Sequence, residues 1–372
     1  MNSVKSLFLL VVLLFFRNSG PGHGKQPAKH ESPFYSANDF TSLEKIDAHV
    51  HIRTGDTAFV HQARVDHFKL LTIVVDESPG IGRQQKYAIE QMRLFPGLVD
   101  FATTFPVTHL NNPHWQERTI ESLKESFIKG AIAVKIYKNI GMELKDNSGR
   151  FIMIDSPVFD PVMSYLEKNN IPVIGHLGEP KNCWLPMDQM TMESDKRYFS
   201  RHPEFYMYLH PDYPSYEDQI NARDRLLEKH PGLRFIGAHL GSMEWSTEEL
   251  ARHLDKFPNM AVDMASRISN LQLQAMQHWQ KVYNFFIKYQ DRLIYGTDRI
   301  ADGSKSDADV KKFVHAAWLN DWTFFCTNDL MSSSSFKGTF KGLQLPKEVI
   351  DKIYRENAEK WFPGISKNII RR

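Results

Sequence analysis

The feature that most constrains this 372-residue chain is a regular alternation of two kinds of segment between residues 45 and 297. Short, nearly continuous apolar runs are typical of parallel strands that are buried on both faces. Longer amphipathic segments lie between them and are typical of helices that cover such a sheet. The predicted strands are 45–50, 68–75, 99–105, 131–137, 171–176, 233–239, 259–264 and 292–297.

Eight strand–helix repeats over about 250 residues predict an α/β protein with the (β/α)8 barrel fold. The main competitor is an open, doubly wound sheet, which favours a glycine-rich phosphate-binding turn directly after its first strand. The corresponding turn here reads HIRTGD, residues 51–56, and has no GxGxxG pattern. The barrel is therefore favoured, with an active site at the mouth formed by the C-terminal ends of the strands.

The sequence before the predicted barrel has two parts. Residues 1–20 contain Lys5 and an apolar run, 7–16, which is typical of a secretory signal peptide and short for a membrane span. An uncleaved N-terminal anchor stays open, because no clear cleavage site follows the run. Residues 21–43 are predicted to be a polar linker, and the barrel is expected over 44–364. The signal predicts an exported protein, either periplasmic or secreted.

Amino-acid composition limits the classes of binding partner that the chain can have. With 24% charged residues and a net charge of +2, the chain gives no electrostatic case for binding nucleic acid or an anionic membrane. We expect a small-molecule substrate, and no membrane span unless the N-terminal segment is uncleaved; an oligomer remains open. Residues 177–219 are an unusually long connection, and their many aromatic side chains predict a packed cap over the barrel mouth.

Polar residues stand at the C-terminal ends of the predicted strands. The residues concerned are His49 and His51 on the first strand, Lys135 on the fourth, His176 on the fifth, His239 on the sixth and Asp298 after the eighth. Each residue alone is explained as a hydrogen-bonded structural side chain. Together they converge at one mouth, and imidazole with carboxylate suits Zn, Mn, Fe or Ni. The pattern therefore predicts a metal centre.

Several segments resemble the amidohydrolase superfamily. These segments are DAHVHI (47–52), GHLGEP (175–180), GAHLGS (237–242), YGTD (295–298) and a final helix, IYRENAEKWF (353–362). The similarity covers roughly residues 44–363. It is greatest for the amidohydrolase-related branch that includes aminocarboxymuconate-semialdehyde decarboxylase and pyrone-dicarboxylate lactonase. The resemblance implies a (β/α)8 barrel with a metal at its C-terminal mouth.

The resemblance also implies a set of metal ligands. His49, His51 and His176 would be ligands, and Asp298 would be a ligand or a proton carrier. His239 matches a histidine that binds a second metal in binuclear members and holds water or substrate in mononuclear ones. We expect one divalent ion per chain rather than two, with zinc favoured over manganese, iron or nickel.

Lys135 has two interpretations under the same resemblance. Some members carry a carbamylated lysine at this place, which bridges two metals. In the branch named above the position more often offers a basic side chain to a substrate carboxylate, and we favour that interpretation.

The resulting hypothesis is a metal-dependent hydrolase of a small, anionic amide, ester or lactone, acting through a metal-activated water. Asp298 would carry the proton, and His239 would polarise the scissile carbonyl or orient the water. Predicted substrate contacts are Lys138, Glu179, Glu244 and Arg267. Three alternatives remain, namely a decarboxylase with the same ligands, a sugar or uronate isomerase, and an exported binding protein without turnover. The complete histidine–aspartate set argues against the last of these.

Overall fold

The computed structural model describes residues 32–365. The predicted signal segment and the first part of the predicted linker, up to residue 31, lie outside the described residues. Within 32–365 no helix has the length and apolar character that crossing a membrane requires.

Nine parallel strands form one sheet, in the order β8-β7-β6-β5-β4-β3-β2-β1-β9. Their bounds are β1 Lys45–Ile52, β2 Phe68–Ile73, β3 Val99–Thr103, β4 Ala131–Ile136, β5 Val173–Gly175, β6 Phe235–Gly237, β7 Met260–Asp263, β8 Leu293–Ile294 and β9 Arg299–Ala301. β2 to β8 each lie within a predicted strand, and β1 begins with the predicted strand 45–50 and extends two residues beyond it.

The sheet closes through its last strand, which is interrupted. β8 pairs with β7, and β9, five residues further on, pairs with β1. Between them the backbone N–H of Ala48 donates to the carbonyl of Tyr295 at 3.0 Å, and the N–H of Asp298 donates to the carbonyl of His49 at 2.7 Å. β8 and β9 are thus two halves of an eighth strand, and the predicted (β/α)8 barrel is confirmed.

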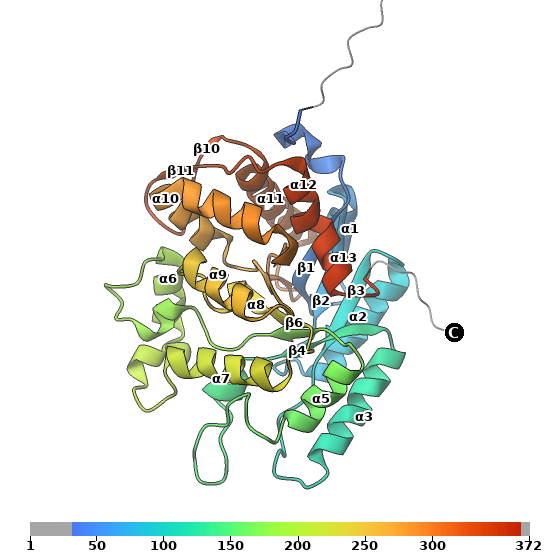
Figure 1. The fold of residues 1–372 in the computed structure, drawn as a ribbon. Helices are drawn as coiled ribbons and strands as arrows, with labels where there is room; N and C mark the ends of the chain where they lie inside the picture. Colours follow the sequence, from blue (N-terminus) through green and yellow to red (C-terminus); the bar gives the residue numbers. More distant parts are fainter. Residues whose placement is uncertain (1–31, 366–372) are drawn as a thin grey trace, which may run out of the picture. The chain divides into compact units, whose positions relative to one another are not determined.

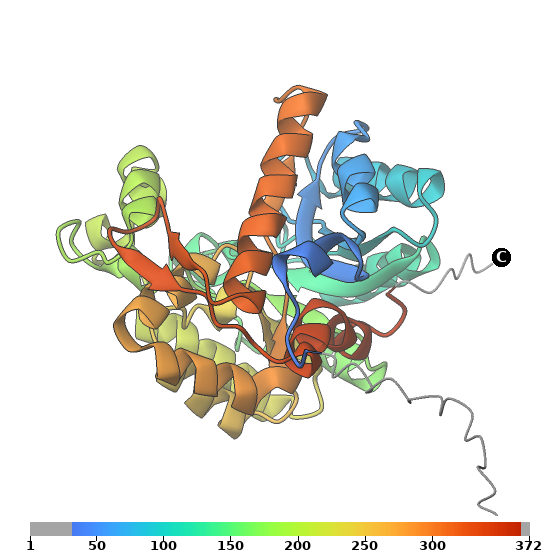
Figure 2. The same ribbon diagram turned by 90° about the horizontal axis from the view of Figure 1, so that it is seen from above.

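Helices surround the strands on the outside (Figure 1). Those that follow successive strands are α1 Ala58–Val65, α2 Ile81–Leu94, α3 Trp115–Ile128, α5 Asp160–Lys168, α7 Tyr216–Lys229, α9 Thr247–Lys256, α10 Ile268–Tyr289 and α11 Asp307–Cys326. The chain ends in α12 Lys347–Asp351 and α13 Asn357–Trp361, joined by a π-helical turn. Figure 2 shows α11 standing beside the N-terminal elements, and Trp318 of α11 stacks on Phe68 with ring centroids 4.3 Å apart.

Two apolar clusters make up the layers of the barrel itself. The larger cluster lies between the strands and the helices. The smaller one contains Ile46, Ala48, Ile174, Ile236 and Ile294 from the strands and Trp361 and Phe362 from the C-terminal end. It fills the inside of the barrel away from the mouth. The interior at the mouth is therefore left to polar residues.

Residues 33–43, the last part of the predicted linker, are packed against the barrel. They include a short helix, Ala37–Thr41, and Phe40 is 3% exposed. Trp322 donates its indole N–H to the carbonyl of Ser36 at 3.0 Å. The compact unit that contains the barrel begins at Pro33, and the first strand of the barrel itself begins at Lys45. Aromatic side chains in an otherwise polar segment supply the apolar surface that binds it.

The long connection after β5 forms a small layer with an apolar cluster of its own. It contains three short 3₁₀ helices, of which Lys181–Trp184 is the first, and the helix α6, Glu193–Arg201. Cys183, Met190, Phe199 and Tyr206 are buried together there. Side chains of α6 line the pocket at the mouth, which agrees with the predicted cap.

Candidate metal centre

An irregularity in β1 aims both of its histidines into the barrel. Ile46 and Ala48 belong to the cluster inside the barrel, whereas Val50 and Ile52 pack in the outer layer with the helices. The register of β1 on β2 shifts between Asp47 and Val50. A bulge of this kind re-aims side chains. The histidines at 49 and 51 therefore face the interior at the mouth.

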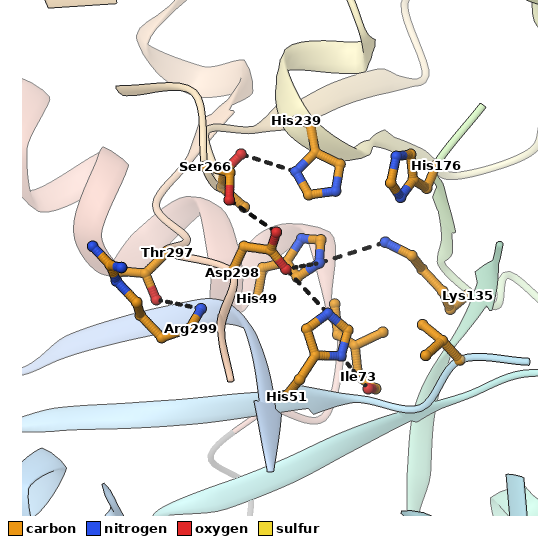
Figure 3. Close-up of polar contacts among 12 residues, drawn as sticks. His49, His51, Ile73, Lys135, His176, His239, Ser266, Thr297, Asp298 and Arg299 are labelled. Carbon is orange, nitrogen blue, oxygen red and sulfur yellow. Dashed lines mark hydrogen bonds and ion pairs between the residues drawn. The ribbon is translucent and has the colours of Figure 1, made fainter. Parts of the chain in front are cut away.

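Three histidines have the same arrangement of ring nitrogens, and Figure 3 shows the contact of His51 with Ile73. In each, Nδ1 is held by an oxygen: His49 by Asp263 Oδ2 at 2.8 Å, His51 by the carbonyl of Ile73 at 2.8 Å, and His239 by the carbonyl of Ala265 at 2.9 Å. A carbonyl only accepts, so Nδ1 of His51 and of His239 donates. Their Nε2 atoms then carry the lone pair, which is the form that binds a metal.

The carboxylate of Asp298 meets these rings. Its Oδ1 lies 3.1 Å from Nε2 of His51 and 3.6 Å from Nε2 of His49, and its Oδ2 accepts a hydrogen bond from Ser266 at 2.9 Å. An acceptor oxygen this close to an acceptor nitrogen is repulsive unless a cation lies between them. The donor set of His49, His51 and Asp298 therefore fits a divalent metal.

A second group of ligand atoms shares His49. It comprises His49, His239 and Asp263, with ligand atoms within 4.8 Å of one another, as in the first group. Asp263 Oδ1 also accepts from the backbone N–H groups of His239 and Ala265. Asp263 thus fixes both the ring of His49 and the turn after β6.

The backbone at this mouth enters the left-handed region after each of three neighbouring strands. His239, Ser266 and Asp298 have φ of 59°, 58° and 61°, and they follow β6, β7 and β8 respectively. Each such residue costs roughly 1–3 kcal/mol and persists only where its surroundings enforce it. The three turns direct side chains of neighbouring strands to one point.

Asp47 lies beneath the histidines and joins β1 to the eighth strand. Its Oδ2 accepts from the hydroxyl of Thr297 at 2.6 Å and from the indole of Trp318 at 2.9 Å. Burial raises its pKa to about 6 despite these bonds. Beside it, a Cβ on Gly296 would lie 2.9 Å from Cβ of His49, so only glycine allows this close approach.

Lys135 lies in the same cluster. It is 1% exposed, and its Nζ is 3.5 Å from Nε2 of His49. Burial lowers the pKa of Lys135 to about 8, and the charges of Asp263 and Asp298 oppose this shift. The structure thus brings Lys135 to the place that the strand-end pattern indicated.

His176 lies at the edge of the cluster. Its ring centroid is 4.4 Å from that of His239, and its Nε2 is 3.7 Å from Oε2 of Glu179. Burial lowers the pKa of His176 to about 4, and Glu179 opposes the shift. Over residues 32–365, the groups of three ligand atoms within 4.8 Å do not include it. Its role as a ligand stays a prediction.

The cluster opens into a cavity of about 680 Å³. Lys138, Glu179 and Arg267 line it, as predicted for substrate contacts. Lys138 and Glu179 form a buried ion pair, and Nη1 of Arg267 lies 3.8 Å from Asp195. These cations therefore have carboxylate partners already.

Glu244 is the exception among the predicted substrate contacts. It is 1% exposed and is not among the described residues that line the cavity. Its Oε1 accepts from the backbone N–H of Lys181 at 2.9 Å, and burial raises its pKa to about 7. Glu244 therefore lies outside the cavity lining, and its predicted substrate contact stays a prediction.

Two carboxylates of the site, Asp47 and Asp263, were not predicted from the sequence. Both lie within apolar strand segments, KIDAHV and NMAVDM. A charged residue in a run that is otherwise buried on both faces is a usable signal, because such a charge must find a partner.

Comparison with known proteins adds a family and a fold. A protein-family model described as amidohydrolase matches residues 104–364. A search of curated proteins gives no match. An uncharacterised TIM-barrel protein from Bordetella bronchiseptica is similar in structure, with a TM-score of 0.51 and 14% identity, covering 87% of this chain and 100% of that one. A 2,6-dihydroxybenzoate decarboxylase from Rhizobium has the same TM-score and identity, covering 86% and 98%.

Proposed function

The chain belongs to the amidohydrolase family, and on this premise we propose that it is a metal-dependent hydrolase of a small, anionic amide, ester or lactone. The observation that carries the proposal is the convergence of His49 and His51 with the carboxylate of Asp298. Both rings are fixed through Nδ1, which leaves Nε2 directed at the carboxylate.

We propose that one zinc ion per chain is held by His49, His51 and Asp298, with His176 as a further ligand. A divalent ion in this donor set lowers the pKa of water and polarises a carbonyl. Carboxylate and imidazole are also suitable ligands for manganese, iron and nickel.

Asp298 is the proposed proton carrier. Burial raises the pKa of its carboxyl, and a cation held between Asp298 and Nε2 of His49 and His51 would oppose this shift and favour the ionised form. It is therefore ionised and can accept a proton from water. Ser266 holds its Oδ2, so Oδ1 keeps a fixed direction towards the histidines.

The tautomer of His239 refines its proposed role. Its Nδ1 donates to a carbonyl, and burial lowers its pKa well below the usual value. A neutral ring with this tautomer accepts at Nε2 and cannot donate from that nitrogen. His239 thus suits the orientation of water, or metal binding, better than the polarisation of a carbonyl.

Lys135 supports an anionic substrate. Its ammonium lines the cavity, and it forms no ion pair within 4.0 Å in the described part of the chain. A substrate carboxylate would supply that partner. Carbamylation of Lys135, with a second metal in the group that contains Asp263, is the alternative.

Decarboxylation is the second candidate function. The Rhizobium protein with a similar fold is a decarboxylase by name, and both reactions use the same ligands and proton carrier. We propose hydrolysis as the first candidate, and the identity of the released product distinguishes it from decarboxylation. Carbon dioxide indicates a lyase, and acid, amine or alcohol release indicates a hydrolase.

The test combines metal analysis with a substrate screen on one preparation. We expect about one divalent ion per chain and turnover of lactones, amides or aromatic carboxylic acids. Asp298→Asn should reduce turnover by a factor on the order of 10³, because it removes the proton acceptor. A metal-free protein without turnover, or full activity in Asp298→Asn, would contradict the proposal.

We also propose export, on the basis of the sequence pattern in residues 1–20. Fractionation of cells that produce the full chain tests this directly. Recovery in the cytoplasmic fraction would contradict it.

A further inference from the structure

Three consecutive helices end in the same way, at the end of the barrel opposite the mouth. The last residues of α1 are Arg64 and Val65, those of α2 are Arg93 and Leu94, and α3 ends at Ile128 before Lys129. The apolar member of each pair projects into solvent, with exposed fractions of 64%, 47% and 80% for Val65, Leu94 and Ile128. We call these six residues the basic–apolar rim.

The rim is continuous across the three helices. The guanidinium of Arg64 lies 5.1 Å from the ring of Phe95, the residue that follows α2. A Cβ on Gly130, just after α3, would lie 3.0 Å from the end of Met92 on α2. The three pairs are therefore neighbours on one surface.

The cations of the rim have no ion-pair partner among residues 32–365, unlike cations elsewhere at the same end. Lys229 pairs with Asp160, Lys256 with Glu228 and Lys288 with Asp255. In the last turns of α1, α2 and α3 the only carboxylate is Glu125. Asp66, at the end of α1, is buried and bound to His315. The rim thus carries three cations against one carboxylate in the same helix turns, although the net charge of the chain is small.

A helix dipole accounts for cations at helix ends, but it does not explain the exposed apolar residues beside them. Basic side chains interleaved with exposed apolar ones are the composition that binds anionic lipid surfaces. A nucleic acid would need only the charge. A second copy of the chain placed symmetrically would set one basic patch against another.

We propose that the basic–apolar rim docks the protein on an anionic phospholipid surface, with the mouth facing away from it. Phe40 packs against Phe68, the first residue of β2, so the segment that begins at Pro33 lies at the same end as the rim.

Vesicle co-sedimentation of the full chain tests the proposal. Vesicles of phosphatidylcholine alone are compared with vesicles in which roughly one lipid in three is phosphatidylserine. We expect binding to the anionic vesicles to be tighter by a factor on the order of 100, from three cations, and to weaken with salt. Residues 1–31 are the same in all variants, so any vesicle binding by that segment does not affect the comparison between them.

A matched pair of variants separates the rim from net charge. Arg64→Glu, Arg93→Glu and Lys129→Glu together should abolish the preference for anionic vesicles. Lys305→Glu, Lys311→Glu and Lys312→Glu make the same change in net charge at the mouth end, where α11 begins, and should retain most of the preference. Equal loss in both variants, or no preference in the unaltered protein, would refute the docking surface.

The apolar side chains are tested separately with Val65→Ser and Ile128→Ser. This variant keeps every charge and should still weaken binding to anionic vesicles by about tenfold. Unchanged binding would mean that the contact is electrostatic only and would overturn the lipid proposal in favour of another polyanion. Metal content and the thermal midpoint, measured on each variant, show that the fold is intact.

Discussion

Each end of the barrel buries a lysine, and the two ammonium groups have different surroundings. Lys45, at the start of β1, donates to the carbonyls of Phe40 and Leu43 and lies between aromatic rings. Lys135, near the end of β4, faces the imidazole of His49. Burial lowers the pKa of both to about 8. The two lysines are buried to a similar extent, but Lys45 contacts backbone carbonyls and Lys135 contacts an imidazole.

The difference separates a structural charge from a functional one. Fixed carbonyls satisfy Lys45, so the N-terminal segment and the barrel hold each other in place. The partner of Lys135 is an imidazole nitrogen whose ring already serves the metal centre. A buried charge without a dedicated partner costs stability, and it is retained where chemistry needs it. The predictions below test this division, from the largest expected effect to the smallest.

His49→Ala removes the residue that both ligand groups share. We expect the bound metal to fall from about one ion per chain to nearly none, with activity lost. His230→Ala, a buried histidine paired with Glu167 away from the mouth, is the matched control and should keep its metal. Retention of a full metal complement by His49→Ala, measured by elemental analysis, would show that the centre lies elsewhere.

Lys135→Met should lower activity by a factor on the order of 10² or more, because it removes the cation proposed to bind the substrate. Unfolding in urea should show a change in stability within about 1 kcal/mol, since no fixed hydrogen bond is lost. A loss of several kcal/mol would place Lys135 with Lys45 as a structural charge.

Lys45→Met should show the reverse result. Two buried carbonyls lose their donor, at about 1–3 kcal/mol each, and relief of the buried ammonium offsets part of this cost. We expect a net destabilisation of about 2 kcal/mol in urea unfolding, with metal content and activity per folded molecule unchanged. A Lys45→Met variant that is stable but inactive would contradict the assignment of Lys45 as a structural charge and Lys135 as a functional one.

Glu244→Gln tests a second buried charge at the mouth, one whose Oε2 has no hydrogen-bond partner among the described residues. Burial raises its pKa in the folded state from 4.5 to about 7. Between these values the unfolded chain binds fewer protons than the folded one, so stability falls as pH rises from 4.5 to 7.

Glutamine keeps the acceptor for the N–H of Lys181 and removes this dependence on pH. Glu244→Gln should therefore match the unaltered protein near pH 4.5 and exceed its stability above pH 7, by up to about 3 kcal/mol. Thermal midpoints at the two pH values measure the difference. An equal shift at both values would show that ionisation of Glu244 is not the cause.

The sequence predicts the barrel well because apolar runs and helical periodicity are local properties. It also brings together His49, His51, Lys135, His239 and Asp298, since one rule about strand ends applies to all of them. Their convergence on one point in the structure follows from that rule.

Other features depend on contacts between distant segments. Asp263 and Asp47 appear as single carboxylates in apolar strands, and only the closed barrel shows which histidine or threonine they hold. Glu244 follows β6 closely in sequence, but it lies outside the cavity lining. The net charge of +2 likewise hides a local concentration of cations at the rim.

The seam between β1 and the eighth strand has a consequence for the timing of assembly. His49 and Asp298 lie on the two sides of that seam, 249 positions apart in the chain. A backbone hydrogen bond from the N–H of Asp298 to the carbonyl of His49 joins them. A nascent polypeptide emerging from the ribosome carries the imidazoles long before it carries the carboxylate. The complete ligand set can therefore form only when nearly the whole barrel has been synthesised, and an incomplete chain cannot assemble it.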